Sequence, residues 1–107
     1  LYARSIDVFL GLPFNIASYA LLLKMIAWSH RLSPRELIIS FGDLHLYKNH
    51  KKQAIEQLTR DPRALPKVYV NADRLDTPIQ TLLSIRWSDI AVSGYDPYPK
   101  IEADVAV

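Results

Sequence analysis

The sequence predicts an α+β protein in which a mixed sheet packs on one long buried helix, and three segments carry that prediction. Residues 1–10 favour a strand, because Val8 and Phe9 are β-favouring residues. Residues 14–30 are apolar on almost all sides, which is typical of a helix that is buried centrally. Residues 37–47 alternate like a second strand. No linker or internal repeat divides the chain, so residues 1–107 are predicted to belong to a single domain.

Shorter elements complete the predicted order. Gly11 permits a turn after the first strand, and Pro13 fits the first turn of the helix. Residues 33–36 have the spacing of a capping box with proline at the first helical position, which favours a short helical turn. The remaining predictions are a helix at 49–59, a strand at 67–70, helical turns at 78–83, a strand at 90–92 and irregular chain from 94 onward.

The long helix needs more protein around it than the remaining residues supply. A helix that is apolar all round requires cover on every side, and a chain of 107 residues builds only a modest core. The chain also begins on Leu1, in the middle of a strand pattern and without a methionine. We therefore expect residues 1–107 to be one part of a larger domain.

Composition favours a soluble, cytoplasmic protein. The 13 basic and 11 acidic residues leave a net charge of +2, so no strong field attracts nucleic acid or a membrane surface. The apolar run at 16–28 is interrupted by Ser18, Tyr19 and Lys24, and we expect it to be too short and too punctuated to span a bilayer. No signal peptide is expected before the first strand.

The lack of cysteine excludes three kinds of chemistry within this chain: a disulfide scaffold, a thiolate metal site and a cysteine nucleophile. His30 and His50 lie far from each other and from any carboxylate at metal-ligand spacing, so no metal site is predicted. The basic run at 48–52 is interpreted as the solvated start of a helix and is assigned no function.

Polar residues gather around the break between the first strand and the helix. Arg4 and Ser5 are side chains that hold phosphate, the arginine by a bidentate fork, although both also suit a solvated strand. Asn15 offers an amide that can pair with the amide edge of a base, or it is a helix cap. His45 and Tyr47, two residues apart, point the same way and form either a ligand-binding pair or an exposed strand pair.

Four stretches resemble one known family. The run LYARSIDVFLGLPFNIASYALL closely resembles the carboxy-terminal half of thymidylate synthase. The stretches GDLHLYKNH, QLTRDPRALPK and GYDPYPKIEADVAV are similar to that family in the same order. The resemblance covers the whole chain, which corresponds to well under half of a family member. It implies the carboxy-terminal part of the thymidylate synthase fold.

The resemblance also implies an activity, the reductive methylation of dUMP to dTMP with methylenetetrahydrofolate as the one-carbon and hydride donor. In the family a cysteine attacks the uracil ring. That cysteine is absent here, so residues 1–107 alone are expected to be inactive. The full-length protein is expected to be a cytoplasmic homodimer that needs no metal, with dUMP and a reduced folate as its partners.

The resemblance assigns nucleotide contacts to five positions. Arg4 and Ser5 match the residues that hold the phosphate of dUMP, and Arg4 also lies near the catalytic thiolate in the family. Asn15 matches the asparagine that pairs with the amide edge of uracil, where an aspartate would suit cytosine better. His45 and Tyr47 match the pair that hydrogen-bonds the deoxyribose hydroxyl and so places the base.

Folate contacts follow from the same resemblance. Asp7 matches a carboxylate that accepts from the amino and ring N–H groups of the pterin, and with Arg4 and Asn15 it is expected to act in catalysis and substrate binding. Leu10, Gly11 and Phe14 match folate-facing positions, although apolar residues there also suit a core. Ala106 belongs to a terminal tail that resembles the family's mobile tail, which closes over the bound folate and excludes water.

The chain departs from the family pattern at four positions. Ala3 stands in place of a glutamine, Phe41 of a small or polar residue, Ala64 of a proline and Tyr98 of a histidine. Ala3 neighbours the nucleotide site and bears on substrate positioning rather than on the class of enzyme. Two alternatives therefore stay open: a deoxyuridylate hydroxymethylase of the same fold, and a non-enzymatic module that binds a nucleotide or RNA.

Overall fold

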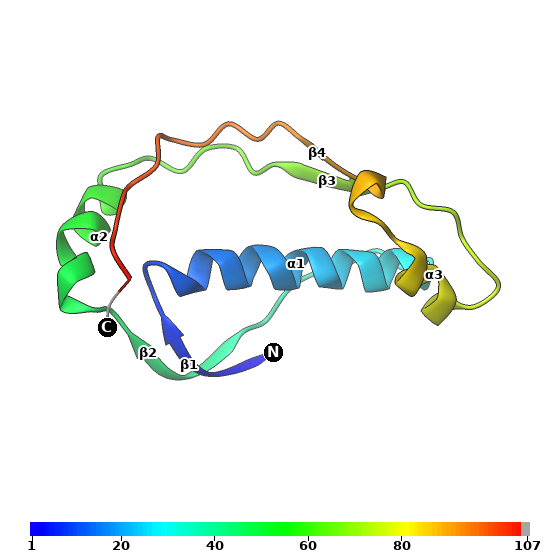
Figure 1. Ribbon diagram of the computed structural model, residues 1–107, viewed down its shortest axis with the longest axis horizontal. Coiled ribbons are helices and arrows are strands. Elements are labelled where there is room, and N and C mark those ends of the chain that lie inside the picture. The colour runs from blue at the N-terminus through cyan, green and yellow to red at the C-terminus, as the bar shows by residue number, and fades with distance from the viewer. Residues whose placement is uncertain (106–107) are drawn as a thin grey trace. The chain divides into compact units, whose positions relative to one another are not determined.

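The computed structural model describes residues 1–105, and the chain divides into two compact units. The first unit contains residues 1–18, 38–63 and 97–105. The second contains residues 19–37 and 64–96. Both units combine helix with strand, so the predicted α+β class is confirmed. Figure 1 shows the elements in chain order.

The first unit is built on a parallel strand pair. Strand β1 (Tyr2–Asp7) lies beside β2 (Ser40–His45), with Ser5 opposite Asp43 and Asp7 opposite His45. A parallel pair requires a crossover connection, which the chain supplies through the long helix. The amide of Val8 donates to the carbonyl of His45 at 2.9 Å and extends the pairing past the end of β1. Both predicted strands form, but each is shorter than the pattern indicated.

Helix α1 (Gly11–Ser29) begins three residues before the predicted start at residue 14, with Pro13 in its first turn, where its missing N–H is tolerated. It ends at a left-handed residue, Arg31, whose φ is 57°. The amide of Leu32 donates to the carbonyl of Ala27 at 2.8 Å, and that of Arg31 to Trp28 at 3.1 Å. These bonds satisfy carbonyls at the helix end in the manner of a Schellman motif.

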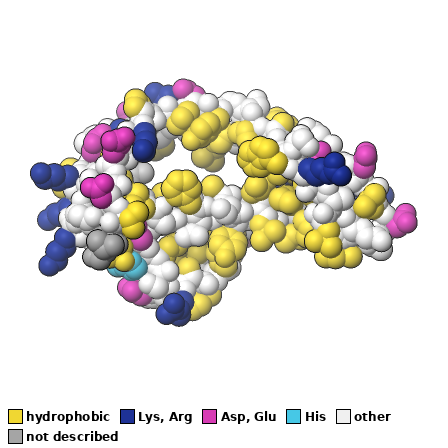
Figure 2. All heavy atoms as spheres, viewed as in Figure 1, with side chains coloured by type: hydrophobic (Ala, Val, Ile, Leu, Met, Phe, Trp, Pro, Cys, Tyr) yellow, Lys and Arg dark blue, Asp and Glu magenta, His cyan; other side chains and the backbone are white. Residues whose placement is uncertain are grey.

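The apolar surface of α1 is largely exposed, which corrects the prediction of a buried helix. Phe14 is 75% exposed, Leu22 43% and Ile26 39%, and within the helix only Ala27 and Ser29 are buried. Figure 2 shows apolar side chains on the visible surface. The physical reason is the short supply of covering chain, because the described residues form only two sheets of two strands each.

The observed length of α1 also corrects the prediction that the apolar run is too short to span a bilayer. Counted from its observed start at Gly11, it has 19 residues and is long and apolar enough to cross a membrane by length and composition. The core helix of a soluble protein passes the same test, so this property does not distinguish a membrane span from a core helix.

The predicted helix at 49–59 appears as two pieces. A single 3₁₀ turn, η1 (Lys48–His50), leads into α2 (Lys51–Leu58). Beyond α2, residues 97–105 have no regular secondary structure, as predicted for the end of the chain. Side chains of η1 and α2 hold this irregular segment through its backbone carbonyls.

The second unit contains an antiparallel pair, β3 (Lys67–Val70) with β4 (Ile90–Ser93), together with helix α3 (Pro78–Ser84) and a 3₁₀ turn, η2 (Trp87–Asp89). The predicted elements at 67–70, 78–83 and 90–92 are thus confirmed. The helical turn predicted at residues 33–36 is wrong, because residues 32–39 form neither helix nor strand.

A capping box forms instead at the start of α3. The amide of Gln80 donates to Thr77 Oγ1 at 3.3 Å, and the amide of Thr77 donates to Gln80 Oε1 at 3.2 Å. In both segments proline follows the capping residue, but only the one at 77–80 continues into a segment that forms a helix. Residues 37–39 are Leu-Ile-Ile, and the β-branched pair disfavours helix.

Candidate functional site

The carboxyl ends of the two parallel strands define the candidate site. Asp7 and His45 are the last residues of β1 and β2 and are register partners. The chain leaves both strands at this edge, through residues 8–10 and residues 46–50. Ligands of parallel sheets bind at the carboxyl ends of the strands, because loops that carry polar groups converge there. The site therefore lies within the first unit.

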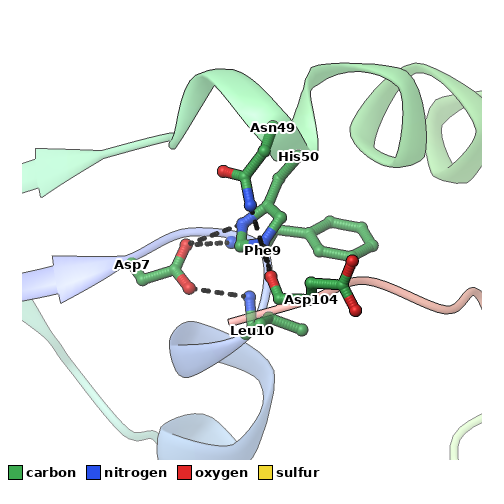
Figure 3. A network of polar contacts seen from close by, with 6 residues as sticks. All are labelled: Asp7, Phe9, Leu10, Asn49, His50 and Asp104. Atoms are coloured by element: carbon green, nitrogen blue, oxygen red, sulfur yellow. Dashed lines mark hydrogen bonds and ion pairs between the residues drawn. The ribbon is translucent and has the colours of Figure 1, made fainter. Parts of the chain in front are cut away.

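Asp7 turns the chain from β1 into α1. Its Oδ1 accepts from the amide of Phe9 at 3.0 Å, and its Oδ2 accepts from the amide of Leu10 at 3.2 Å (Figure 3). The side chain is 18% exposed. An ionised carboxylate has about four acceptor positions, so two backbone donors leave room for further donors such as the N–H groups of a heterocycle.

His50 is completely buried beside Asp7, and the sequence analysis missed it by assigning the whole basic run to solvent. Its exposure is 0%, and its Nε2 lies 2.7 Å from the carbonyl oxygen of Asp104. Its Nδ1 lies 3.9 Å from Asp7 Oδ1. The ring packs against Phe9 at a centroid distance of 5.5 Å and against Tyr47 at 5.9 Å. The one available signal was an aromatic side chain within a run of lysines.

The structure brings His45 and Tyr47 together. Their ring centroids lie 5.0 Å apart in an edge-to-face arrangement. His45 Nδ1 also lies 3.3 Å from Asp43 Oδ2, an atom that accepts from the Ser5 hydroxyl at 3.3 Å. Asp43 was not predicted as a site residue, although the alternation of residues 37–47 placed it on the face that carries His45. The deoxyribose role of the pair stays a prediction.

Arg4 and Ser5 both lie exposed on β1, but successive strand residues point to opposite faces. Ser5 faces Asp43 together with His45, whereas Arg4 occupies the other face of the strand. A phosphate held by both side chains would have to lie at the strand margin, where both can reach it. The carboxylate of Asp43 would also stand close to that phosphate and oppose its charge.

Asn15 lies half-buried in the first turns of α1. Its Nδ2 is 3.8 Å from the point that a Cβ on Gly11 would occupy, so the amide folds back toward the start of the helix. The structure thus places Asn15, Gly11 and Asp7 in one neighbourhood, since the same point lies 3.5 Å from Asp7 Cβ. Base recognition by this amide stays a prediction.

A pocket of about 490 Å³ opens beside the turn that follows Asp7. Its apolar wall contains two of the predicted folate-facing residues, Leu10 and Phe14, with Phe9 and Pro13. Its other lining residues are mainly polar or basic: Gln57, Arg60, Asp61, Pro62, Arg63, Tyr98, Lys100 and Ile101. An apolar wall and a cationic rim suit a ligand with aromatic rings and carboxylates.

Tyr98, one of the departures from the family pattern, organises the basic rim. The guanidinium carbon of Arg63 lies 4.0 Å from the centre of the Tyr98 ring, and that of Arg60 lies 5.5 Å from it. Arg60 also pairs with Glu56 at 2.8 Å and donates to the carbonyl of Pro99 at 2.6 Å. Stacking on a tyrosine face stabilises the arginine cations by about 0.5–1 kcal/mol each at such partly exposed sites.

The last two predictions concern the Ala106 contact and the expected lack of a metal site. Ala106, the predicted tail contact, lies outside the described residues, which end at Val105. Among residues 1–105, no group of three or more His, Cys, Asp or Glu side chains is placed to hold a metal ion.

A family model described as thymidylate synthase matches residues 1–107, the whole chain.

Proposed function

Because the chain belongs to the thymidylate synthase family, a family of methyltransferase enzymes, we propose that it supplies nucleotide and folate contacts for the reductive methylation of dUMP to dTMP. Methylenetetrahydrofolate, when bound, supplies the one-carbon unit and the hydride. The observation that carries the proposal is the position of Asp7, at the strand end and beside a pocket whose wall contains Leu10 and Phe14.

The folate half of the site rests on that pocket. Asp7 keeps acceptor capacity for the N–H groups of a pterin, because only two backbone amides occupy its carboxylate among the described hydrogen bonds. Leu10 and Phe14 offer apolar surface to the rings, and Gly11 lets the ligand approach the backbone closely. The basic rim that Tyr98 organises suits the carboxylates of a folate. Ala106 is proposed to close over the ligand and exclude water.

The nucleotide half rests on β1, β2 and the start of α1. Arg4 and Ser5 are proposed to bind the phosphate, with Ser5 exchanging its bond to Asp43 for one to a phosphate oxygen. Asn15 is proposed to pair with the uracil amide edge, which presents a carbonyl beside an N–H. The adjacent rings of His45 and Tyr47 are proposed to direct two polar groups to the deoxyribose hydroxyl and so fix the base for attack.

The nucleophile must come from outside these residues. The chain contains no cysteine, and the family mechanism needs one to activate the uracil ring. We therefore propose that residues 1–107 form the carboxy-terminal portion of one synthase domain, that the complete protein is a cytoplasmic homodimer, and that a polypeptide limited to residues 1–107 does not turn over dUMP.

The test is an assay of the complete native protein with dUMP tritiated at C5 and methylenetetrahydrofolate. Tritium release together with dihydrofolate and dTMP is expected of the synthase. Tritium release without dihydrofolate would identify a hydroxymethylase instead. Weak dUMP binding that folate does not strengthen, without any turnover, would identify a binding module. Two further tests address the origin of the nucleophile. The coding frame upstream of Leu1 is read for a cysteine, and the polypeptide of residues 1–107 is assayed alone. Turnover of dUMP by that polypeptide would refute the proposal that the nucleophile lies outside these residues.

A further inference from the structure

We propose that His50 is a positioning residue that fastens the C-terminal segment, residues 101–105, beside Asp7. The part of the proposal that concerns folate rests on the proposed function, in which Asp7 binds the pterin. The part that concerns the C-terminal segment rests on the described contacts alone.

Three side chains of η1 and α2 hold two carbonyls of the C-terminal segment. His50 Nε2 lies 2.7 Å and Asn49 Nδ2 3.3 Å from the carbonyl oxygen of Asp104. Gln53 Nε2 lies 3.4 Å from the carbonyl oxygen of Glu102. The segment has no helix or strand of its own, so its position depends on such contacts. The bond from His50 is the shortest of the three, and its donor is fully buried.

The geometry assigns the proton on the imidazole. A backbone carbonyl oxygen only accepts, so His50 Nε2 carries a hydrogen and donates to Asp104. The other nitrogen, Nδ1, makes no hydrogen bond within residues 1–105, and Asp7 Oδ1 lies 3.9 Å from it. That distance exceeds hydrogen-bond length by less than 1 Å. With the hydrogen on Nε2, Nδ1 and Asp7 Oδ1 are both acceptors, so the ring lies close beside the carboxylate without a hydrogen bond to it.

One rigid ring thus lies between the C-terminal segment and the carboxylate that is proposed to bind the pterin (Figure 3). Packing against Phe9 and Tyr47 restricts the ring, because both contacts lie within 6 Å between ring centroids. A displacement of Asp104 is therefore transmitted to the neighbourhood of Asp7.

Three substitutions at position 50 distinguish the roles of the two ring nitrogens. Glutamine places its amide nitrogen near the position of Nε2, so His50→Gln keeps the donor to Asp104. Asparagine is shorter and reaches only the position of Nδ1, so His50→Asn loses that donor. His50→Phe keeps an aromatic ring in the buried position and removes both nitrogens. His30→Gln is the matched control, because His30 is exposed and belongs to the second unit.

The first measurement is amide hydrogen exchange of residues 101–105 in the complete native protein. We expect exchange there to rise about tenfold in His50→Asn and His50→Phe, the effect of losing one buried hydrogen bond, and to stay near the native rate in His50→Gln and His30→Gln. The amides of the β1–β2 pairing should keep their protection in all four variants. Native exchange at 101–105 in His50→Asn would overturn the proposal, and so would equal loss of protection in β1–β2, which would mean a purely structural role.

The second measurement separates this inference from the proposed function. In the variants that free the C-terminal segment, the KM for methylenetetrahydrofolate should rise about tenfold while the Kd for dUMP stays constant, and His50→Gln should restore the native KM. An unchanged folate KM with a freed segment would overturn the link to Asp7. If the native protein does not turn over dUMP at all, the proposed function fails, and the exchange rates still decide whether His50 fastens the segment.

Discussion

The carboxamide of Asn15 is the residue-scale feature on which the proposed base preference depends. A carboxamide complements the carbonyl and N–H of uracil, whereas a carboxylate offers acceptors only and suits the amino group of cytosine. We expect Asn15→Asp to weaken dUMP binding by about 1–3 kcal/mol, which is roughly fivefold to 150-fold, and to improve dCMP binding. Titration calorimetry of the complete protein with each nucleotide measures both effects.

Ser18→Ala is the control for that substitution, since Ser18 is exposed on the same helix and has no proposed contact. Its affinities for dUMP and dCMP should match those of the native protein. If Asn15→Asp binds dUMP as tightly as before, the amide acts only at the helix start and base recognition must come from elsewhere.

Asp7 and His50 show which site residues could be predicted from this sequence and which could not. Asp7 was identified because it lies within the run of residues 1–22 that resembles the family. His50 was assigned to solvent because the lysines around it are exposed, and its burial comes from contacts with Asp104, 54 residues later in the chain. Asp43 was missed for a similar reason, because its contact with Ser5 joins two strands.

At the scale of elements, the close approach of β1 and β2 depends on Gly42. A Cβ on Gly42 would lie 2.7 Å from the carbonyl oxygen of Arg4 and 2.5 Å from the hydroxyl of Tyr2. The backbone oxygen cannot move without disturbing the strand pairing that places Asp7 beside His45. We expect Gly42→Ala to lower the free energy of unfolding by about 1–3 kcal/mol, the usual cost of overpacking. Chemical denaturation of the complete protein checks this value.

Gly11→Ala is the matched control for that experiment. The added Cβ would meet its nearest neighbour, Asp7 Cβ, at 3.5 Å, an ordinary contact, and alanine suits a helix better than glycine. Its stability should equal or exceed that of the native protein. A Gly42→Ala protein as stable as Gly11→Ala would show that the two strands can separate slightly without cost.

Helices and strands were predicted correctly where the local sequence pattern determines them. The predictions failed where contacts distant in sequence or the following residues decide. The strands predicted at 67–70 and 90–92 and the helical turns predicted at 78–83 follow from turn residues and side-chain type. Residues 33–36 carry the same capping signal as residues 77–80, yet β-branched residues follow and no helix forms. The pairing of Ala3 with Phe41 was not predictable from either strand alone. It places two departures from the family pattern opposite each other, a small side chain against a large one.

At the scale of the whole molecule, apolar surface dominates the behaviour expected of residues 1–107. Exposed apolar side chains occur along α1 and in both units, including Phe14 at 75%, Leu83 at 78% and Trp87 at 80%. Monomeric soluble proteins rarely expose large contiguous apolar patches. The described residues do not cover the apolar surface of α1. The helix would therefore be buried only if other parts of a complete domain packed against it.

A polypeptide limited to residues 1–107 is therefore expected to associate, because Leu22 and Ile26 are one helical turn apart on α1 and present apolar surface that water disfavours. Replacing both with lysine should reduce dye binding by exposed apolar surface and shift the polypeptide toward its monomer mass of 12.2 kDa in sedimentation. Ser18→Lys, which adds charge on the same helix without removing apolar surface, should change neither result.

In the complete protein the double substitution should have the opposite effect and destabilise the fold, since the same side chains would then be covered. Equal stability of the complete protein with and without the substitutions would mean that α1 has no protein cover, and insertion of the native polypeptide into lipid vesicles would then identify a membrane as the environment of the helix.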